Sequence, residues 1–386
     1  MKILVAKWRA YLVEDIIKEF KARGHIVSTV QFEMTGYVMK SEDIVRIEEH
    51  VQKECPDFVF SMNFFQEISD ICQRDKIKYL CWTYDAPCIN VYDASALNKC
   101  NYIFLFDDAV REDLVNAGVK NAYYLPLAVN NTFSQQIELS EADKEKYTTD
   151  ISFVGSTYEE KCGLYNQCEG VLDPYILGYF EGVMEAQRKL DGNFILREMM
   201  TPEIEKYILE SMNFDLGERY LLSKIDFFVY FFLGQKSTAL QRKFILQWIA
   251  NHYQLDLYTE MVPKDFSGNL KLHPHIDYSK LGKIYRTSKV NLNFTMPNIR
   301  EGIPLRVMDI LGSGGFLITN YRKALCDVFE DGKDLVVYYD EYDLLQKIDY
   351  YLSHEEERIR IAENGRRKVL SQHNLSIKID FMLAKL

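Results

Sequence analysis

The sequence predicts an α/β protein made of two doubly wound domains, each built on a parallel sheet. Apolar strands alternate with amphipathic helices over roughly the first 130 residues, and the same alternation resumes after a polar stretch at 131–149. Most of these strands are apolar throughout, which is typical of parallel sheets that carry helices on both faces. The chain has 386 residues, enough for two domains with separate cores.

The predicted first domain begins with the strand MKILVA. An amphipathic helix follows, with Gly24 placed to end it, because glycine adopts the left-handed conformation at a helix end without strain. A second strand, HIVSTVQF, and a polar helix from Ser41 to about Glu54 come next. Four further strands are expected at PDFVFSMN, KYLCWTYD, NYIFLFD and AYYLPLAV, with helices at 65–76 and at DAVREDLVNAG between them.

The polar stretch QQIELSEADKEKYTT is predicted to be a linker, because it has little apolar surface to bury. The strand DISFVGS follows, and then a mostly helical insertion at about 158–251. The second sheet is completed by LDLYT, LKLHPHIDY, KVNLNFT, GFLITNY and DLVVYYD, and the residues after these strands are helical. The expected domains are 1–135 and 148–374, with a cleft between them.

Composition argues against several classes of function. The formal charge of −11 works against binding to a nucleic-acid backbone or to an anionic membrane. The longest aromatic and apolar run, IDFFVYFFL, is too short to cross a bilayer, and an N-terminus that starts directly with a strand does not resemble a signal peptide. The eight cysteines include no CxxC pair, so we expect reduced thiols in a cytoplasmic protein.

The most informative stretch is NLNFTMPNIREGIPLRVMDILGSGGFLITNY, at 291–321. It predicts a buried strand, a loop that carries Glu301 and Gly302, a helix after Pro304 and a second buried strand. An acid and a helix N-terminus then lie at the carboxyl end of a strand, where open α/β sheets bind ligands. Free N–H groups and the helix dipole favour an anion such as a diphosphate there. Asp309, eight positions after Glu301, is placed to hold the hydroxyls of an attached ribose or sugar.

Further residues are candidate partners of this anion. Arg306, in the first turn of the helix, carries a guanidinium whose fork matches phosphate oxygens, and the backbone around Gly302 and Ile303 supplies N–H groups. Gly155 and Ser156, at the end of the strand DISFVGS, offer further amides and let the backbone approach a ligand closely. Each feature also has a structural explanation, as a solvated arginine or an ordinary strand-to-helix turn.

Asp85 is the candidate catalytic residue of the first domain. It stands at the end of the strand KYLCWTYD and is followed by Ala86 and Pro87, and a proline prevents the strand from continuing. At the carboxyl edge of the sheet, its carboxylate is placed to act as a base on an acceptor hydroxyl or to hydrogen-bond a sugar. The alternative role is the capping of a turn, which is common for aspartate.

Three other kinds of site are not expected. His273, His275 and Asp277 are close in sequence, but zinc needs three or four ligands in reach and no second cluster is present. No GxGxxG follows the first strand, which argues against a nicotinamide dehydrogenase. The sequence also lacks GxSxG, the motif of a serine hydrolase.

Together these residues resemble the GT-B glycosyltransferases of the spore-maturation (CgeB-like) type, which carry an uncharacterised N-terminal domain before a family 1-like glycosyltransferase domain. The resemblance covers most of the chain and is strongest in GIPLRVMDILGSGGFLITNY. It implies two Rossmann-like domains, a nucleotide-sugar donor held by the C-terminal one, and no required metal or cofactor. It also implies that the last helix, 375–386, joins the N-terminal domain. Both acids of the related two-acid motif are commonly Glu, whereas the second is Asp309 here, one methylene shorter.

The expected function is transfer of a sugar from a nucleotide-sugar donor to a protein, a glycan or a lipid-linked sugar. Asp85 would be catalytic, and the expected donor-binding residues are Gly155, Ser156, Glu301, Gly302, Ile303, Arg306 and Asp309. The sequence leaves two alternatives: a catalytically silent module that binds a nucleotide sugar or a glycan, and a sugar-nucleotide epimerase on the same fold.

Overall fold

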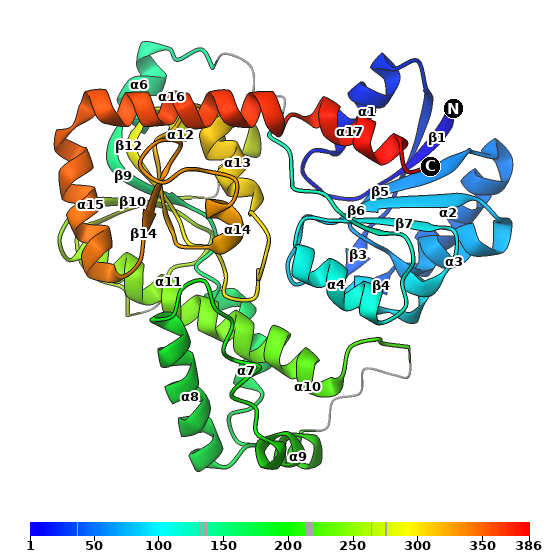
Figure 1. Cartoon of the computed structure of the whole chain (residues 1–386), viewed down its shortest axis with the longest axis horizontal. Helices are drawn as coiled ribbons and strands as arrows, with labels where there is room; N and C mark the ends of the chain where they lie inside the picture. The colour runs from blue at the N-terminus through cyan, green and yellow to red at the C-terminus, as the bar shows by residue number, and fades with distance from the viewer. Residues whose placement is uncertain (37, 131–132, 134–136, 213–218, 264, 275) are drawn as a thin grey trace. The chain divides into compact units, whose positions relative to one another are not determined.

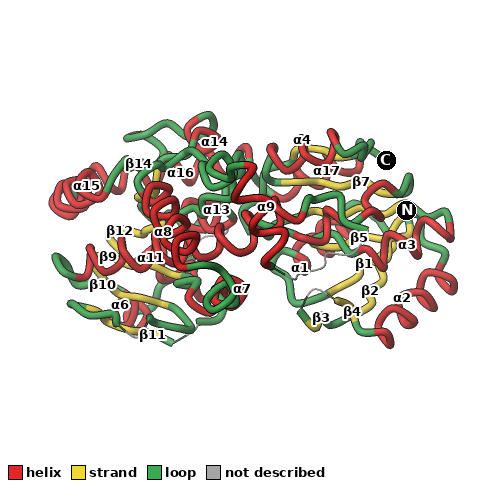
Figure 2. Tube along the Cα trace, turned by 90° about the horizontal axis from the view of Figure 1, so that it is seen from below, coloured by secondary structure: helices red, strands yellow, loops and turns green. Residues whose placement is uncertain are grey.

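A computed structural model describes the chain except for residues 37, 131–132, 134–136, 213–218, 264 and 275 (Figure 1). The chain forms two compact units. Unit 1 comprises Met1–Asn131, Leu216–Leu222 and His373–Leu386, and unit 2 comprises Thr132–Asp215 and Ser223–Gln372. Each unit has its own six-stranded sheet. The prediction of an α/β protein with two doubly wound sheets is confirmed, and Figure 2 shows the strands of each unit with helices around them.

The sheet of unit 1 has the strand order β2-β1-β5-β6-β7-β8, and all neighbouring strands are parallel. In the register between β1 and β5, Ile3 pairs with Phe58. Because the chain reverses its direction of winding between β1 and β5, the loops after these two strands form the topological switch point of unit 1. The strands are β1 (Lys2–Lys7), β2 (Ile26–Gln31), β5 (Phe58–Met62), β6 (Lys78–Trp82), β7 (Asn101–Leu105) and β8 (Ala122–Tyr124).

Helices cover this sheet, and the last one comes from the C-terminus of the chain. α17 packs on α1, where Arg23 Nε donates to Asp380 Oδ1 at 2.9 Å. Gly24, with φ of 79°, follows α1 and takes the left-handed conformation that its position predicts. The helices of unit 1 are α1 (Val13–Ala22), α2 (Ser41–Glu54), α3 (Gln66–Asp75), α4 (Asp108–Asn116) and α17 (Leu375–Leu383), with short 3₁₀ turns η1 (Ile89–Tyr92) and η2 (Ala94–Leu97) and a small hairpin of β3 (Met34–Thr35) and β4 (Val38–Met39).

The sheet of unit 2 has the order β11-β10-β9-β12-β13-β14 and is also parallel throughout. Here the direction of winding reverses between β9 and β12, which pair with Ile151 opposite Val290. The loops after β9 and β12 are therefore the switch point of unit 2. The strands are β9 (Thr149–Val154), β10 (Leu255–Tyr258), β11 (Leu270–His273), β12 (Ser288–Asn293), β13 (Leu317–Asn320) and β14 (Val336–Tyr338).

A helical insertion separates β9 from β10, as predicted, and Figure 1 shows α8 and α9 extending away from the sheet of unit 2. The insertion contains η3 (Glu159–Lys161), α7 (Gly163–Asn166), α8 (Pro174–Arg188), α9 (Pro202–Ser211), α10 (Lys224–Phe227), the π-helical η4 (Phe228–Leu233) and α11 (Gly234–Ala250). The later helices are η5 (Tyr278–Lys280), α12 (Leu281–Thr287), α13 (Leu305–Gly312), α14 (Lys323–Cys326), α15 (Glu341–Ser353) and α16 (Glu355–Gln372).

The stretch predicted to be a linker is partly helical. α6 (Glu141–Tyr147) forms within it and belongs to unit 2. The oxygen of Ser140 accepts a bond from the N–H of Asp143, whose carboxylate accepts one in return, and Lys283 Nζ lies 2.8 Å from the same carboxylate. The linker prediction is therefore wrong for these residues. The prediction rested on the low apolar content of this stretch and did not consider its capping box, which stabilises a short helix.

The eight cysteines are free; seven are buried or half-buried, and Cys55 is exposed. Within the described part of the chain, no helix is both long and apolar enough to cross a membrane. The described residues also contain no group of three or more His, Cys, Asp or Glu side chains that could hold a metal ion. His273 instead pairs with Asp256, at 2.6 Å, and His275 lies outside the described residues.

Candidate anion site at the switch point of unit 2

Two neighbouring strand ends form the centre of the candidate site. β9 ends at Val154 and is followed by Gly155, and β12 ends at Asn293. Since the two strands are parallel and adjacent, both ends lie at the same edge of the sheet. α13 begins nearby, after the loop that follows β12. No side chain caps its N-terminus, and the N–H of Val307 donates to the carbonyl of Pro304 at 3.0 Å, so the N–H groups of Leu305 and Arg306 are the ones placed to meet another acceptor.

Arg306 lies against the end of β9. Its guanidinium carbon is 5.1 Å from the centre of the Phe153 ring, and its Nη1 donates a long hydrogen bond to Asn293 Oδ1 at 3.4 Å. A side chain at position 155 would overlap this guanidinium, and Gly155 has φ of 148°. A glycine is therefore required at position 155 both by the backbone conformation and by the close approach of Arg306.

A second arginine approaches the same ring. Arg242, in α11, is 3% exposed and has its guanidinium carbon 5.7 Å from the centre of the Phe153 ring. Its Nη1 donates to the carbonyl of Ser156 at 2.7 Å, and its Nη2 donates to the carbonyl of Phe294 at 3.0 Å. These two bonds hold Arg242 between the loops that follow β9 and β12.

The described carboxylates compensate the charges of these two arginines only at a distance, since Glu160 acts on Arg242 and Asp309 acts on Arg306. Neither Arg242 nor Arg306 forms an ion pair with a described Asp or Glu, and Arg242 Nε is buried without a hydrogen-bond partner. Burial and then the charge of Arg306 lower the pKa of Arg242. Two like charges around one buried ring are unfavourable without a counter-ion, so this arrangement is suited to an anion that contacts both guanidiniums.

Asp309 lies in the same helix as Arg306 but is buried. Tyr278 donates its hydroxyl to Asp309 Oδ2 at 2.8 Å, and Oδ1 has no partner among the described residues. Burial raises the pKa of Asp309 to about 8, while the bond from Tyr278 and the charge of Arg306 act in the opposite direction. The structure therefore brings Asp309 and Arg306 into electrostatic contact, with a buried acceptor oxygen left over.

The other predicted donor-binding residues differ in their surroundings. Glu301 is exposed in the loop before α13 and shares no hydrogen bond with Asp309. Gly302 and Ile303 are buried in that loop. Ser156 accepts a bond from the N–H of Tyr158 at 2.7 Å and bonds to Glu160, so its hydroxyl stabilises the turn after β9. The Ser156 side chain therefore fits the structural explanation, an ordinary strand-to-helix turn. The backbone carbonyl of Ser156 accepts the hydrogen bond from Arg242.

Asp85 lies in unit 1, and its position differs slightly from the prediction. β6 ends at Trp82, so Asp85 is in the loop three residues beyond the strand rather than at its last residue. Asn63, which follows β5, donates its side-chain amide to Asp85 Oδ2 at 2.6 Å and accepts a bond from the N–H of Tyr84 at 2.9 Å. Asp85 is exposed, and it is held beside the switch point of unit 1.

Comparisons with known proteins bear on the fold of the chain. Residues 241–384 match the family model described as glycosyl transferase-like. No curated protein matches the sequence. A glycosyltransferase from Rickettsia africae ESF-5 aligns with 99% of this chain and 97% of its own, at 13% identity and a TM-score of 0.53.

Two solved structures with a bound nucleotide sugar are also similar to this chain over nearly the whole length of both chains. Alr3699/HepE of Anabaena, in complex with UDP-glucose, aligns over 100% of both chains at 8% identity and a TM-score of 0.55. The BGT of phage T4, in complex with its UDP-glucose substrate, aligns with 100% of this chain and 98% of its own, at 10% identity and a TM-score of 0.52. The fold is GT-B. The predicted fold class is therefore confirmed, and the family match, which includes α11 from Gln241 onward and α13, supports the prediction of a glycosyltransferase enzyme.

Two residues of the candidate site were missed by the sequence-based prediction. Arg242 follows the apolar spacing of α11, since Thr238, Ile245 and Ile249 are buried on the same face. An arginine at such a position is a signal, because a charged group is seldom buried without a function or a partner. Tyr278 carried no such signal, because nothing in the sequence indicates that it reaches Asp309.

Proposed function

We propose that this chain is a GT-B glycosyltransferase whose donor is a nucleoside diphosphate sugar, bound by unit 2. The observation that carries the proposal is the pair Arg242 and Arg306, which flank the Phe153 ring without a carboxylate partner among the described residues. The pair lies at the switch point of a doubly wound sheet, where such sheets bind nucleotides. The two UDP-glucose complexes among the similar structures make uridine the first nucleotide to test.

The diphosphate would lie between Arg306 and the uncapped N-terminus of α13, at Gly302 and Ile303, with Gly155 leaving room for the Arg306 guanidinium. Arg242 would add a second positive charge near the Phe153 ring. Asp309, with its unpartnered oxygen, and Glu301 would accept hydrogen bonds from hydroxyls of the ribose or the sugar. Such a site needs no metal, because the two guanidiniums supply the positive charge.

In the reaction, the bond between the anomeric carbon of the sugar and the diphosphate oxygen breaks, and a bond to an acceptor oxygen forms. Negative charge develops on the leaving diphosphate, and Arg242 and Arg306 would stabilise it more strongly than in the ground state. The acceptor hydroxyl must lose its proton, and Asp85 is proposed to accept it. The acceptor is proposed to be a protein, a glycan or a lipid-linked sugar.

The test is a thermal-shift screen of the full chain against UDP, GDP, ADP, CMP, dTDP and their sugar conjugates without added metal. A ligand at about 100 times its dissociation constant adds roughly 2.7 kcal/mol to the free energy of unfolding, which corresponds to a few degrees. We expect a selective shift that is lost in Arg306→Ala. Arg360→Ala is the matched control, because Arg360 is an exposed arginine of α16. No shift with any nucleotide would refute the donor site.

A second candidate function is nucleotide-sugar binding without transfer. The observation that favours it is that the Asp309 carboxylate is buried and accepts a hydrogen bond from Tyr278. A carboxylate that binds a ligand would instead face that ligand. Tight and saturable binding of a UDP-sugar, together with no release of UDP in the presence of glycan, protein or lipid acceptors, would favour this function over a transferase.

A further inference from the structure

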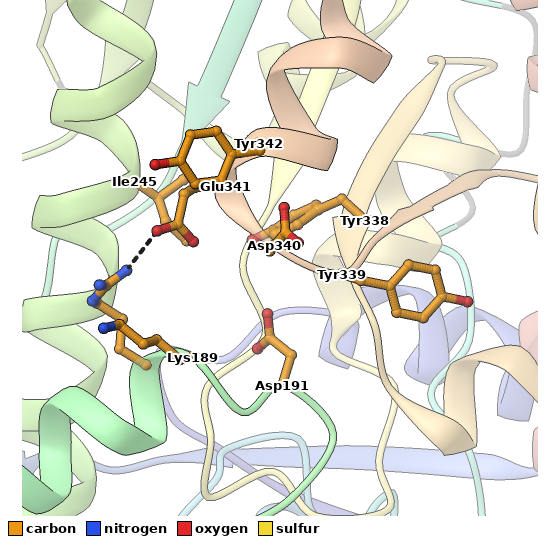
Figure 3. A pocket seen from close by; sticks show the side chains of 9 residues that line it. Lys189, Asp191, Ile245, Tyr338, Tyr339, Asp340, Glu341 and Tyr342 are labelled. Atoms are coloured by element: carbon orange, nitrogen blue, oxygen red, sulfur yellow. Dashed lines mark ion pairs between the residues drawn. The ribbon is translucent and has the colours of Figure 1, made fainter.

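Unit 2 contains a cavity that shares no residue with the two-arginine site. Its volume is about 220 Å³, and it is lined by the end of β14, the start of α15, the end of α8 and the loop that follows α8 (Figure 3). The cavity residues are Arg188, Lys189, Asp191, Ile245, Tyr338, Tyr339, Asp340, Glu341 and Tyr342.

Asp191 has one oxygen bound and one available. Its Oδ1 accepts hydrogen bonds from the side-chain amides of Asn320, at 2.8 Å, and of Gln241, at 3.1 Å. Figure 3 shows the carboxylate projecting from its loop toward the segment that carries Tyr338 and Asp340. The two amides therefore fix the orientation of Asp191 and direct its second oxygen to the cavity.

The lining of the cavity carries charged groups of both signs. Three carboxylates, Asp191, Asp340 and Glu341, are opposed by Arg188 and Lys189. Arg188 is held by two bonds to Glu185 and lies 3.8 Å from Glu341, so its charge is already compensated. No group of metal-binding side chains occurs among the described residues, and this includes the three carboxylates.

Two aromatic rings complete the lining. Tyr339 and Tyr342 are 55% and 64% exposed, although they lie at a polar cavity. Exposed tyrosine rings next to carboxylates suit a ligand that has apolar C–H faces and hydroxyl edges, which is the chemistry of a sugar ring.

We propose that this cavity binds a single neutral saccharide unit, with Asp191 bonding its hydroxyls and Tyr342 packing on its ring. The site is separate from the proposed diphosphate site, so it does not depend on the proposed function. A free monosaccharide and one residue of a longer glycan share this chemistry.

The experiment is ligand-observed NMR and calorimetry on the full chain with glucose, galactose, mannose, N-acetylglucosamine and short glucans, with methylamine as a cationic probe. We expect saturable binding of at least one neutral saccharide. Asp191→Asn and Tyr342→Ala should weaken that binding at least tenfold. Glu210→Gln, an exposed carboxylate of α9, is the control that should leave it unchanged.

Several results would overturn the proposal. These are no binding of any neutral saccharide, binding of methylamine alone, or saccharide binding that Asp191→Asn and Tyr342→Ala leave intact. Arg306→Ala should retain saccharide binding while losing nucleotide binding. Loss of both in Arg306→Ala would show that the cavity belongs to the nucleotide site and would refute a separate site. Tyr342→Ala changes an exposed ring, so it keeps the test valid if Asp191→Asn fails to fold.

Discussion

Unit 1 and unit 2 each present a switch point at the carboxyl edge of a parallel sheet, but the side chains there differ in charge. In unit 1, Trp8 follows β1 and packs on Phe65, with ring centres 5.6 Å apart, and on Tyr84, at 6.2 Å. Asn63 holds Asp85 beside these rings. In unit 2, the corresponding edge holds Arg242 and Arg306 around Phe153.

This difference shows that the sheet determines where a site lies, whereas a few side chains determine which ligand the site binds. Backbone N–H groups and strand ends are available at both edges, because both sheets are parallel and doubly wound. An exposed carboxylate with aromatic neighbours is suited to hydroxyl groups and protons. Two guanidiniums without a described carboxylate partner are suited to a phosphate anion.

The strongest test of this comparison removes the charge at the unit 1 edge. In Asp85→Asn, we expect transfer to fall by about 10²- to 10⁴-fold, the usual contribution of a general base, with UDP affinity unchanged. Release of UDP from the donor in the presence of the acceptor measures the rate, and calorimetry measures the affinity. Glu112→Gln, an exposed carboxylate of α4, should leave both values unchanged. Equal losses of rate and affinity would contradict the division of roles between the two edges.

The second test removes a buried charge from the unit 2 edge. In Arg242→Met, we expect UDP to bind about 10- to 100-fold more weakly, because a charged hydrogen bond contributes about 1.5–3 kcal/mol. Arg358→Met is a matched control, since Arg358 is also buried and also donates to two backbone carbonyls, those of Tyr351 and Leu352. Calorimetry with UDP should therefore separate the two variants even if both lose stability. Parent-like affinity in Arg242→Met would exclude Arg242 from the anion site.

A third test concerns the close approach of Arg306 to the strand end. Gly155→Ala should lower the free energy of unfolding by about 1–3 kcal/mol, because φ of 148° is strained for alanine, and should displace the Arg306 guanidinium. Gly163→Ala is the control, because no atom lies within 4 Å of the position that its Cβ would take. Urea unfolding and UDP titration of the two variants check the prediction. A Gly155→Ala variant with full stability and UDP affinity would show that this contact is not needed.

A fourth test is a pH dependence that distinguishes the buried acid of unit 2. Burial raises the pKa of Asp309 to about 8 from the ordinary value of 3.8, so the folded state binds a proton that the unfolded state has lost between these values. The contribution of Asp309 to stability must therefore fall as pH rises from about 4 to 8, by at most about 1.4 kcal/mol per pH unit.

Urea unfolding of the parent and of Asp309→Asn at pH 5, 6.5 and 8 measures this effect. The asparagine variant should gain stability relative to the parent as the pH rises. Glu210→Gln, which changes an exposed carboxylate, should differ from the parent by the same amount at each pH. A constant difference for Asp309→Asn would show that Asp309 titrates in the ordinary range.

Much of the fold was predictable from local pattern. The continuous apolar strands indicated parallel sheets, and the segment 291–321 indicated β12, α13 and β13 with Arg306 in the first turn of the helix. α6 was not recognised, because the prediction weighed apolar content and overlooked the capping pair Ser140 and Asp143. The capping pair and the hydrophobic period can both be recognised in the sequence, so α6 could have been predicted.

The amino-acid pattern is enough to show which strands are buried, where a glycine ends a helix, and that an acid and an arginine accompany the helix after Pro304. These properties depend on neighbours within a few residues along the chain. That Arg242, 64 positions before Arg306, reaches the same Phe153 ring, and that Asp309 turns toward Tyr278, is visible only once the chain is folded. The strand order brings these distant segments to one edge of the sheet, and charge and burial at that edge depend on all of them together.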